Sequence, residues 1–471
     1  MQLNIFDMLK DEYKYDNSKP VRLIELFAGY GSQALALEFL NVNFEHYKAC
    51  EFDKYAIETY NAFHNTNFAT SDITQLKAKD LEINNTNQYT YVMTYSFPCT
   101  DLSLAGKRMG MEKGSGTRSG LLWEVERLLN ELDNNLPQIL LMENVPQVIK
   151  ANGWEQWQAY LESKGYSNYC EILNAKDFGI PQNRERCFMI SILGNYNYHF
   201  PQKIKLKYLL KDLLENEVDE KYYLSEEKIK QISNWKAQQD HLKDIDKEKK
   251  ICPTLTARGV GEEHSGMILI NEATIKGYAI AKEGDSVNLE QPNSKTRRGR
   301  VGKQEANTLT TSCNQGVVVL GNYMPSNHNA SRIVDDNGIA PTVMENHGTV
   351  TAVCIGGFGN KCNKDKQYHM QNRVYDNKIA TANTSSFQPY YYHNLCIRKL
   401  TPNECYKLMG VPNRINCKTK VSSSQQYKQA GNSIVTTVLM AIFGELLGID
   451  WKVKINELTK ELVEKENKNG K

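Results

Sequence analysis

The stretch Val21-Arg22-Leu23-Ile24-Glu25-Leu26-Phe27, followed by Ala28-Gly29-Tyr30-Gly31 and a helical pattern from Ser32, decides the fold of this chain. The apolar run predicts a strand, and the two glycines predict a tight turn. The apolar spacing from Ser32 onward predicts a helix. Glycines in such a turn let backbone amides reach a ligand at the helix N-terminus. The stretch therefore predicts the first strand, turn and helix of an open α/β sheet.

Downstream, apolar runs alternate with helical patterns as far as residue 193. Further strands are predicted at residues 91–97, 138–142, 169–173 and 187–193, and helices near 121–132 and 155–164. Glu51 ends the strand after the glycine turn, where the ribose hydroxyls of a nucleotide-type ligand need an acceptor, and Asp72 ends a third segment. This alternation predicts a doubly wound α/β domain.

Two reactive side chains follow two of these strands. Cys99 comes after the run 91–97, and Glu143 comes after 139–142. The carboxyl ends of parallel strands border one crevice, so both groups are placed to share a substrate. A thiolate that adds to carbon 6 of cytosine, while a carboxylic acid protonates nitrogen 3, makes carbon 5 methylatable. The alternatives are that Cys99 is a small buried hydrophobe and that Glu143 caps a helix starting at Pro146.

Length and composition indicate an ordinary globular protein. The chain has 471 residues, 40% of them hydrophobic, which is enough for a buried core and for two or three domains. Its eleven cysteines include no C-x-x-C pair, and we expect neither an export leader nor an apolar run of about eighteen residues. Disulfides, secretion and membrane insertion are therefore not expected. No metal-ligand motif is visible, so we predict no metal.

The net charge of +2 is unevenly distributed. Residues 106–118 and 295–303 are locally basic, and each is either a set of phosphate contacts or a solvated loop. The candidate DNA contacts in them are Lys107, Arg108, Arg297, Arg298 and Arg300. Residues 211–250 mix both charges and predict an exposed helical connector.

Beyond the connector the pattern changes to short β-like runs rich in Gly, Asn, Thr and Ser, from residue 251 to about 392. Within them an Arg recurs eight to ten residues before a Thr-centred run. The instances are Arg300 with 307–310, Arg332 with 341–344 and Arg373 with 380–383, with a shorter echo at 252–258. These are either scaffold hairpins or hairpins whose tips carry Arg to DNA.

The order of motifs closely resembles that of the DNA (cytosine-5) methyltransferases of bacterial or phage type, from Arg22 to about Leu447. The motifs are Phe27-Ala28-Gly29-Tyr30-Gly31, Pro98-Cys99, Glu143-Asn144-Val145, Gln182-Asn183-Arg184-Glu185-Arg186, Arg398-Lys399-Leu400-Thr401-Pro402-Asn403-Glu404 and Gly431-Asn432-Ser433. The resemblance implies a Rossmann-like S-adenosylmethionine-dependent domain with a smaller, mostly β target-recognition domain.

By position, the resemblance implies that Cys99 is the nucleophile and Glu143 the acid, and that Arg184 and Arg186 hold the flipped base and its backbone. A positive partner such as Arg184 near Cys99 would favour its thiolate. The cofactor residues that it implies are Phe27, Gly29, Gly31, Glu51, Asp72, Ile73, Pro98, Asn432 and Ser433. Two departures from the family pattern are Ser32, in place of a further glycine, and Thr100, in place of glutamine. Residues 104–120 have the composition of a loop that closes over DNA.

The expected organisation is an N-terminal arm (1–20), a catalytic domain (21–195), a target-recognition domain with its connector (196–420), a return to the catalytic domain (421–450) and a charged tail (451–471). The predicted reaction transfers a methyl group from S-adenosylmethionine to carbon 5 of a flipped-out cytosine in double-stranded DNA. A tRNA methyltransferase and a catalytically silent DNA-binding protein are the alternatives. We expect a monomer in the cytoplasm, associated with the nucleoid, with a restriction endonuclease as a possible separate partner.

Overall fold

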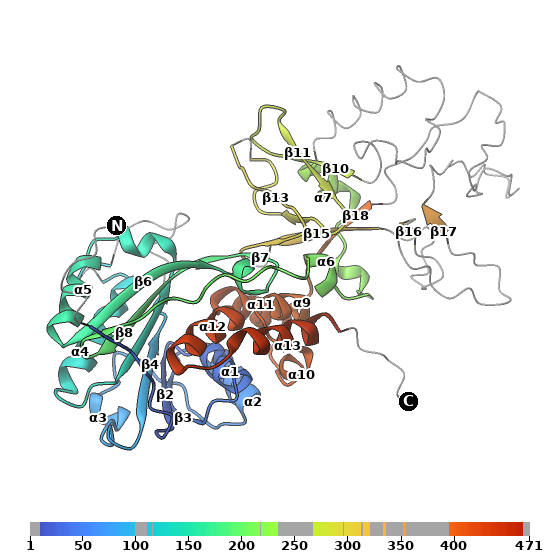
Figure 1. The fold of residues 1–471 in the computed structure, drawn as a ribbon. Coiled ribbons are helices and arrows are strands. Elements are labelled where there is room, and N and C mark those ends of the chain that lie inside the picture. The colour runs from blue at the N-terminus through green and yellow to red at the C-terminus, as the bar shows by residue number, and fades with distance from the viewer. Residues whose placement is uncertain are drawn as a thin grey trace, which may run out of the picture. The chain divides into compact units, whose positions relative to one another are not determined.

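A computed structural model describes residues 10–98, 111–114, 116–216, 218–233, 267–294, 296–311, 314–320, 333–335, 352–354 and 395–464. The chain forms two compact units (Figure 1). Unit 1 comprises Met1–Glu215, Asn307–Cys313 and Thr401–Lys471, and unit 2 comprises Asn216–Ala306 and Asn314–Leu400. Residues 196–215 and 401–420, which were assigned from the sequence to the smaller domain, thus belong to unit 1.

Unit 1 is built on a six-stranded sheet. Its strands, in spatial order, are β3 (Phe44–Cys50), β2 (Val21–Leu26), β4 (Thr90–Tyr95), β5 (Ile139–Asn144), β8 (Glu185–Leu193) and β6 (Tyr166–Asn174). Strands β3, β2, β4 and β5 are parallel, and β8 runs antiparallel to both of its neighbours. The chain passes from β2 to β3 on one side and then to β4 on the other. The strand order therefore reverses between β2 and β4, where open α/β sheets bind their ligands.

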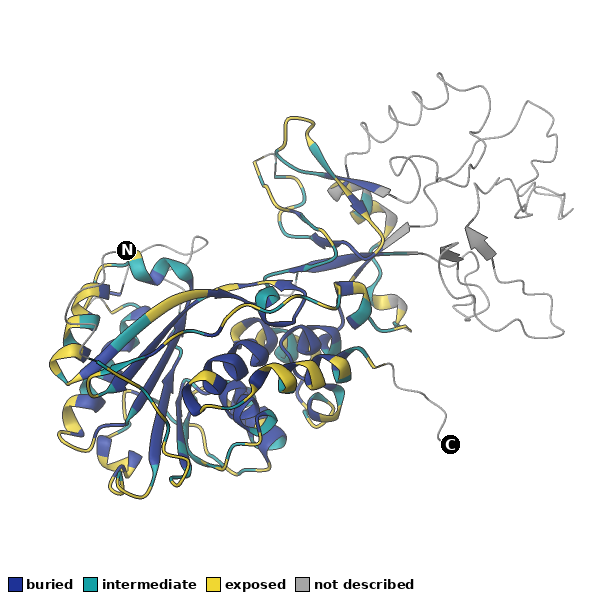
Figure 2. Cartoon of the chain, in the orientation of Figure 1, coloured by how far each residue is buried: buried dark blue, intermediate teal, exposed yellow. Residues whose placement is uncertain are grey.

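Helices cover both faces of this sheet (Figure 1). One face carries α4 (Leu122–Glu131) and α5 (Trp154–Ser163), and the other carries α1 (Ser32–Phe39), α2 (Lys54–His64) and α12 (Thr436–Leu447). Strands β4 and β5 are buried at every residue (Figure 2). They read as continuous apolar runs because both of their faces are covered. The predicted doubly wound α/β fold is confirmed.

The remaining elements of unit 1 are short or lie near its C-terminus. They are β1 (Asp11–Glu12), α3 (Ala78–Leu81), η2 (Ser119–Leu121), η3 (Pro146–Lys150), η4 (Ala175–Phe178), β7 (Gln182–Asn183), β9 (Tyr196–Asn197), α6 (Leu210–Leu213), α9 (Pro402–Leu408), α10 (Asn413–Asn416), α11 (Ser423–Asn432) and α13 (Trp451–Val463). Helix α13 occupies the segment expected as a charged tail, and it buries Trp451, Ile455 and Leu458.

The R-x-L-T-P-x-E motif is a helix start. Thr401 accepts from the Glu404 amide at 3.2 Å, and the Glu404 carboxylate accepts from the Thr401 amide at 2.8 Å. Pro402 occupies the first turn, where its missing N–H costs nothing. This reciprocal capping box fixes where α9 begins.

One segment, Ser423–Leu447, is long and apolar enough to span a membrane by length and composition. The expectation that no such run occurs is therefore wrong by this test. However, 83% of its apolar window is buried inside the protein, mostly as helix α12. A core helix passes the same test, so the segment is weak evidence for a membrane span.

Unit 2 is mostly β in its described part. A hairpin joins β10 (Met267–Asn271) to β11 (Tyr278–Lys282), and a four-stranded sheet has the order β13 (Val301–Gly302), β12 (Ser286–Asn288), β15 (Gln315–Leu320) and β18 (Leu395–Lys399). The other elements are η5 (Glu220–Tyr222), α7 (Glu226–Ile232), β16 (Ile333–Asp335) and β17 (Ala352–Cys354), while β14 (Ala306–Asn307) lies where the first segment of unit 2 ends. Residues 234–250 of the connector and the repeats at 252–258, 341–344 and 380–383 lie outside the described residues. The described residues of the second unit are thus mostly β, as the sequence predicts for this domain.

The turn after β2 requires glycine. Phe27, Gly29 and Gly31 all have positive φ, of 60°, 59° and 82°. A Cβ on Gly31 would lie 2.3 Å from His64 Nε2 and 2.7 Å from Tyr60 Cε2. Glycine is needed here both for the left-handed backbone and for close packing.

Substituting Gly31 by Ala should lower the free energy of unfolding by about 2–5 kcal/mol, through backbone strain and the collision with His64. Gly448→Ala is the matched control, because Gly448 also has positive φ (66°) but no atom within 4 Å of its would-be Cβ. The control should cost only about 1 kcal/mol. Urea denaturation measures the free energy of unfolding of both variants. Equal losses in the two variants would show that the close approach to His64 adds nothing to the backbone strain.

Candidate active site

The segment Phe27–Gly31, called the glycine loop below, lies at the carboxyl end of β2. The Glu51 carboxylate, just past β3, accepts from the Gly29 amide at 2.8 Å and from the Asp53 amide at 2.8 Å. The Gly31 amide donates to the Ala28 carbonyl at 2.9 Å. Both glycine amides are therefore used within the protein, and what the glycines provide is the positive φ and the absence of side chains. Burial raises the pKa of Glu51, while the backbone amides act against that shift.

The Gly431-Asn432-Ser433 motif reaches this loop from the end of α11. A Cβ on Gly29 would lie 3.8 Å from Ser433 Oγ. Ser433 is buried, whereas Asn432 is exposed. A Cβ on Gly431 would lie 2.5 Å from the carbonyl carbon of Thr310, so glycine allows Thr310 and Thr311 to pack closely on α11. The structure thus brings Ser433 together with the glycine loop.

Asp72 and Ile73 lie in a turn beside Glu51. The Ser71 amide donates to the Glu51 carbonyl at 2.8 Å, which brings this turn to the end of β3. The Asp72 carboxylate accepts from the Thr74 amide and hydroxyl, each at 2.9 Å, and so holds its own turn. Ile73 is buried in the core.

The segment after β4 is fixed to the end of β5. Asn144 donates from its side-chain amide to the Phe97 carbonyl at 3.0 Å, and the Ser119 hydroxyl donates to the Pro98 carbonyl at 2.8 Å. The Asn144 contact follows from the parallel pairing that sets Tyr95 opposite Met142, whereas Ser119 reaches Pro98 from η2. Pro98 therefore lies at the same end of the sheet as Glu143. Cys99 itself, with Lys107 and Arg108, lies outside the described residues.

Glu143 is a buried carboxyl group that faces an arginine. It is 7% exposed, and its Oε1 lies 3.1 Å from Arg186 Nε. Burial raises the pKa of Glu143, while the positive charges of Arg186 and Arg184 pull it down. The net shift is upward, which is the direction that a proton donor needs near neutral pH. Strand β8 supplies this partner because Glu143 pairs across the sheet with Phe188, two residues from Arg186.

Arg184 is buried and binds the protein's own backbone. Its guanidinium donates to three carbonyls: Leu309 at 3.1 Å, Gly431 at 2.9 Å and Ser433 at 2.7 Å. Next to it, Gln182 donates to the Leu408 carbonyl at 2.7 Å. The Q-x-R-x-R motif thus has two parts: Gln182 and Arg184 hold segments of unit 1 together, and Arg186 faces Glu143.

The three candidate arginines of unit 2 differ in their surroundings. Arg300 is fully buried, and its guanidinium donates to the carbonyls of Asn288, Glu290 and Gln291 at 2.7–3.0 Å. Arg297 lies 3.0 Å from the Glu290 carboxylate. Arg298 is exposed. Among these three, Arg298 is the one available to a large partner at the surface.

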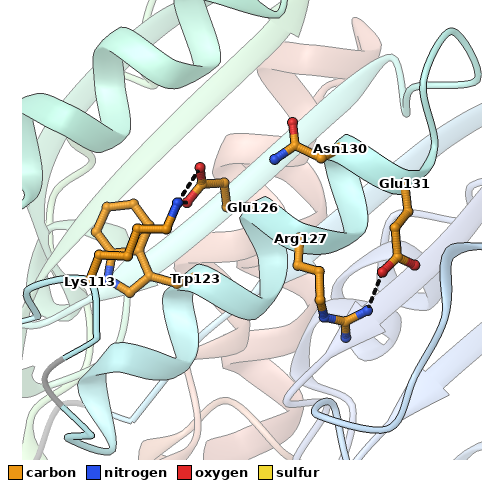
Figure 3. A pocket seen from close by; sticks show the side chains of 6 residues that line it. All are labelled: Lys113, Trp123, Glu126, Arg127, Asn130 and Glu131. Carbon is orange, nitrogen blue, oxygen red and sulfur yellow. Dashed lines mark hydrogen bonds and ion pairs between the residues drawn. The ribbon is translucent and has the colours of Figure 1, made fainter.

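An open hollow runs along α4 (Figure 3) and is lined by Lys113, Trp123, Glu126, Arg127, Asn130 and Glu131. Its charged side chains pair with one another, Lys113 with Glu126 at 2.8 Å and Arg127 with Glu131 at 2.7 Å. None of the predicted catalytic or cofactor residues lines it. This hollow is therefore separate from the site described above.

The model of the family described as C-5 cytosine-specific DNA methylase matches residues 21–448. The chain belongs to this family. It is a DNA cytosine-5 methyltransferase, and the resemblance seen in the motifs is confirmed.

Similar methyltransferases come from bacteria and phages. The type II methyltransferase M2.ScrFI of Lactococcus lactis subsp. cremoris is 36% identical over 277 residues, which cover 48% of this chain and 75% of the relative. The orphan methyltransferase M.SssI of Spiroplasma monobiae is 36% identical over 45% of this chain and 69% of the relative. The orphan methyltransferase M.SPRI of Bacillus phage SPR is 27% identical over 91% of this chain and 97% of the relative.

Solved structures share the fold. The Dnmt2 methyltransferase of S. pombe is 18% identical with a TM-score of 0.50, and it aligns over 91% of this chain and 99% of its own. The methyltransferase EhMeth of Entamoeba histolytica is 15% identical with a TM-score of 0.52, over 91% and 98%. At these identities the likeness concerns the S-adenosylmethionine-dependent methyltransferase fold alone.

Sequence reasoning missed the positioning contacts. Asn144 was quoted as part of a motif without a function, although it ties β5 to the segment before Cys99. The group Glu38, His46 and His64, which could hold a metal ion, was not noticed, because its members lie on three different elements. Spacing along the chain gives no signal for such a group.

Replacing Arg184 by Met should lower the free energy of unfolding by about 2–4 kcal/mol, because three buried carbonyls lose their donor. Arg186→Met is the contrasting variant. It takes the cation away from the buried Glu143, which can then take up a proton, so the loss in free energy of unfolding should be smaller, about 1–2 kcal/mol. Thermal and urea denaturation compare the two. A stable Arg184→Met protein would show that the three carbonyl contacts are not a structural requirement.

Proposed function

We propose that this methylase transfers the methyl group of S-adenosylmethionine to carbon 5 of a flipped-out cytosine, through a covalent bond between Cys99 and carbon 6. The observation that carries the proposal is Glu143, a buried carboxyl group with a raised pKa, located at the end of β5 and thus at the same end of the sheet as Pro98, which precedes Cys99 in the sequence. An acid there can protonate nitrogen 3 of the ring and make carbon 6 electrophilic.

The residues around the glycine loop fit S-adenosylmethionine. Gly29 lies next to Ser433, whose Oγ would be 3.8 Å from a Cβ on Gly29, so a hydroxyl group and a backbone without a side chain stand side by side. The Glu51 carboxylate uses one acceptor site on each oxygen for a backbone amide, which leaves acceptor capacity for ribose hydroxyls. Asp72, Ile73, Phe27, Gly31, Pro98 and Asn432 would complete the site. When bound, the cofactor supplies an electrophilic methyl group.

The reaction would be divided between two side chains. Cys99 would form a bond to carbon 6, and Glu143 would give its proton to nitrogen 3. After methylation at carbon 5, the carbon 5 proton would pass to water, the thiolate would leave carbon 6 and the nitrogen 3 proton would return to Glu143. These steps would release 5-methylcytosine and return both side chains to their starting forms. A cytosine within duplex DNA hides carbon 6, so the base must leave the stack, at a cost of a few kcal/mol.

Arg186 and Arg184 would act in different ways. Arg186 lies beside Glu143 with its side chain 17% exposed, so it would contact the flipped base or its backbone. Arg184 would position Leu309, Gly431 and Ser433 through its three carbonyl contacts, and would add positive potential near Glu143. We propose further that the enzyme acts as a monomer in the cytoplasm, that its chemistry requires no metal, and that a cognate restriction endonuclease would act as a separate protein.

The test is a covalent trap. Duplex DNA containing 5-fluorocytosine and S-adenosylmethionine should give a denaturation-resistant adduct with wild-type protein, because fluorine at carbon 5 prevents the final elimination. Cys99→Ala should form no adduct and still bind DNA. Glu143→Gln should form it about 10²–10⁴ times more slowly, since general acid catalysis is lost, with cofactor affinity unchanged.

Base-resolution mapping of 5-methylcytosine in a host that lacks it, with Cys99→Ala as the control, identifies the target sequence. An unmethylated genome and no adduct, from soluble protein, would favour a tRNA substrate or a silent DNA-binding protein. Methyl transfer to tRNA in the absence of transfer to DNA would select the first of these.

In unit 2, Arg298→Ala should weaken DNA binding and reduce the slope of log K against log salt by roughly one, because one phosphate contact is lost. Arg300→Ala should instead destabilise unit 2, since Arg300 is buried against three carbonyls. Binding isotherms at several salt concentrations separate these effects. An unchanged slope for Arg298→Ala would remove it from the DNA interface.

A further inference from the structure

Three metal-ligating side chains converge beneath the glycine loop. Glu38 comes from α1, His46 from β3 and His64 from the last turn of α2. Glu38 Oε1 lies 2.6 Å from His64 Nδ1 and 3.4 Å from His46 Nε2, and all three ligand atoms lie within 4.8 Å of one another. The active-site chemistry uses none of these groups.

The second nitrogen of each ring is held by an acceptor. His64 Nε2 lies 3.0 Å from the Tyr30 carbonyl, which can only accept, so this nitrogen carries the proton. The Tyr60 hydroxyl donates its single proton to Glu25 at 2.6 Å, so it accepts from His46 Nδ1 at 3.3 Å. The remaining nitrogens, His64 Nδ1 and His46 Nε2, are the two that face Glu38.

In neutral rings these two nitrogens present lone pairs, and Glu38 Oε1 presents a third. Three electron pairs directed at one point need a positive species between them. A metal ion can take that place, and the two rings already stand close together, with centroids 4.9 Å apart. Among the described residues, no Lys or Arg forms an ion pair with Glu38 or with the buried Glu25. A single divalent cation would balance these two carboxylates.

We propose that Glu38, His46 and His64 bind one divalent transition-metal ion of the zinc type. Two imidazoles and a carboxylate are a common zinc ligand set, and ligands with bonds of about 2.1 Å stand about 3.4 Å apart around a tetrahedral ion. The Glu38–His46 separation already has this value, and the Glu38–His64 separation must widen by less than about 1 Å. Glu38 is 29% exposed, which allows that movement and lets water take the fourth position.

The hydrogen bonds made by the second nitrogen of each histidine ring match those of metal-bound histidines. Such a histidine donates its other N–H to a carbonyl, carboxylate or similar acceptor, which fixes the ring. Here the acceptors are the Tyr30 carbonyl and the Tyr60 hydroxyl, with Glu25 behind Tyr60. Because Tyr30 belongs to the glycine loop and Gly31 packs on His64, the ion would stiffen that loop. The consequence for S-adenosylmethionine rests on the function proposed above.

The experiment titrates chelator-treated full-length protein with Zn²⁺, without DNA or cofactor, and uses Co²⁺ absorption to report the ligand geometry. Wild-type protein should bind one ion in this site, show the visible bands of four-coordinate cobalt and unfold at a higher temperature when Zn²⁺ is present. His46→Gln and Glu38→Gln should each weaken this binding more than tenfold. His199→Gln is the matched control, because His199 is exposed and lies outside the cluster.

Zn²⁺ bound by cysteines elsewhere would be the same in every variant, so the difference between His46→Gln and His199→Gln isolates the site. If either His46→Gln or Glu38→Gln does not fold, Zn²⁺ binding by the other cluster variant still tests the site. Equal Zn²⁺ binding in wild type and in both cluster variants would overturn the proposal. The three side chains would then form a hydrogen-bonded network without a metal ion. Because this readout needs no methyl transfer, its failure is distinct from failure of the proposed reaction. Added Zn²⁺ should also lower the dissociation constant of S-adenosylmethionine several-fold in wild type and not in His46→Gln.

Discussion

The buried guanidinium of Arg184 connects the parts of unit 1 that are far apart in the sequence. It donates to carbonyls of Leu309, Gly431 and Ser433, from two segments that lie more than a hundred residues downstream. A planar group with five donors can satisfy several carbonyls at once, which Lys could not do in the same geometry. Ser433 in turn borders Gly29. The position of Ser433 beside the glycine loop therefore depends on the guanidinium of Arg184, just before β8.

Much of the fold could be predicted because its signals are local. The apolar runs of β2, β4 and β5 and the helical patterns of α4 and α5 fall within a few residues of their observed bounds. Thr401 and Glu404, three residues apart, form the capping box that such spacing favours. These elements follow from short-range periodicity and caps, which one sequence carries in full.

The functions of individual arginines could not be predicted in the same way. Arg297, Arg298 and Arg300 look alike in the sequence, yet one is paired, one is exposed and one is buried against backbone carbonyls. Similarly, Arg184 and Arg186 stand two residues apart on the same motif and face different partners. These arginines differ in the hydrogen-bond acceptors that tertiary folding brings close to them. A local sequence pattern does not predict which acceptors these are. The group Glu38, His46 and His64 was invisible for the same reason.

Two opposing effects act on the pKa of Glu143. Burial favours the neutral acid, and the arginine at 3.1 Å favours the carboxylate. With burial alone the group would hold its proton too strongly to release it, and with the ion pair alone it would seldom carry one. The reaction proposed above requires Glu143 to give a proton to a ring nitrogen and later regain it, and such a group needs both forms within reach near neutral pH. The antiparallel β8, which alone in this sheet reverses direction, brings Arg186 to the carboxyl end of β5 and so makes that balance possible.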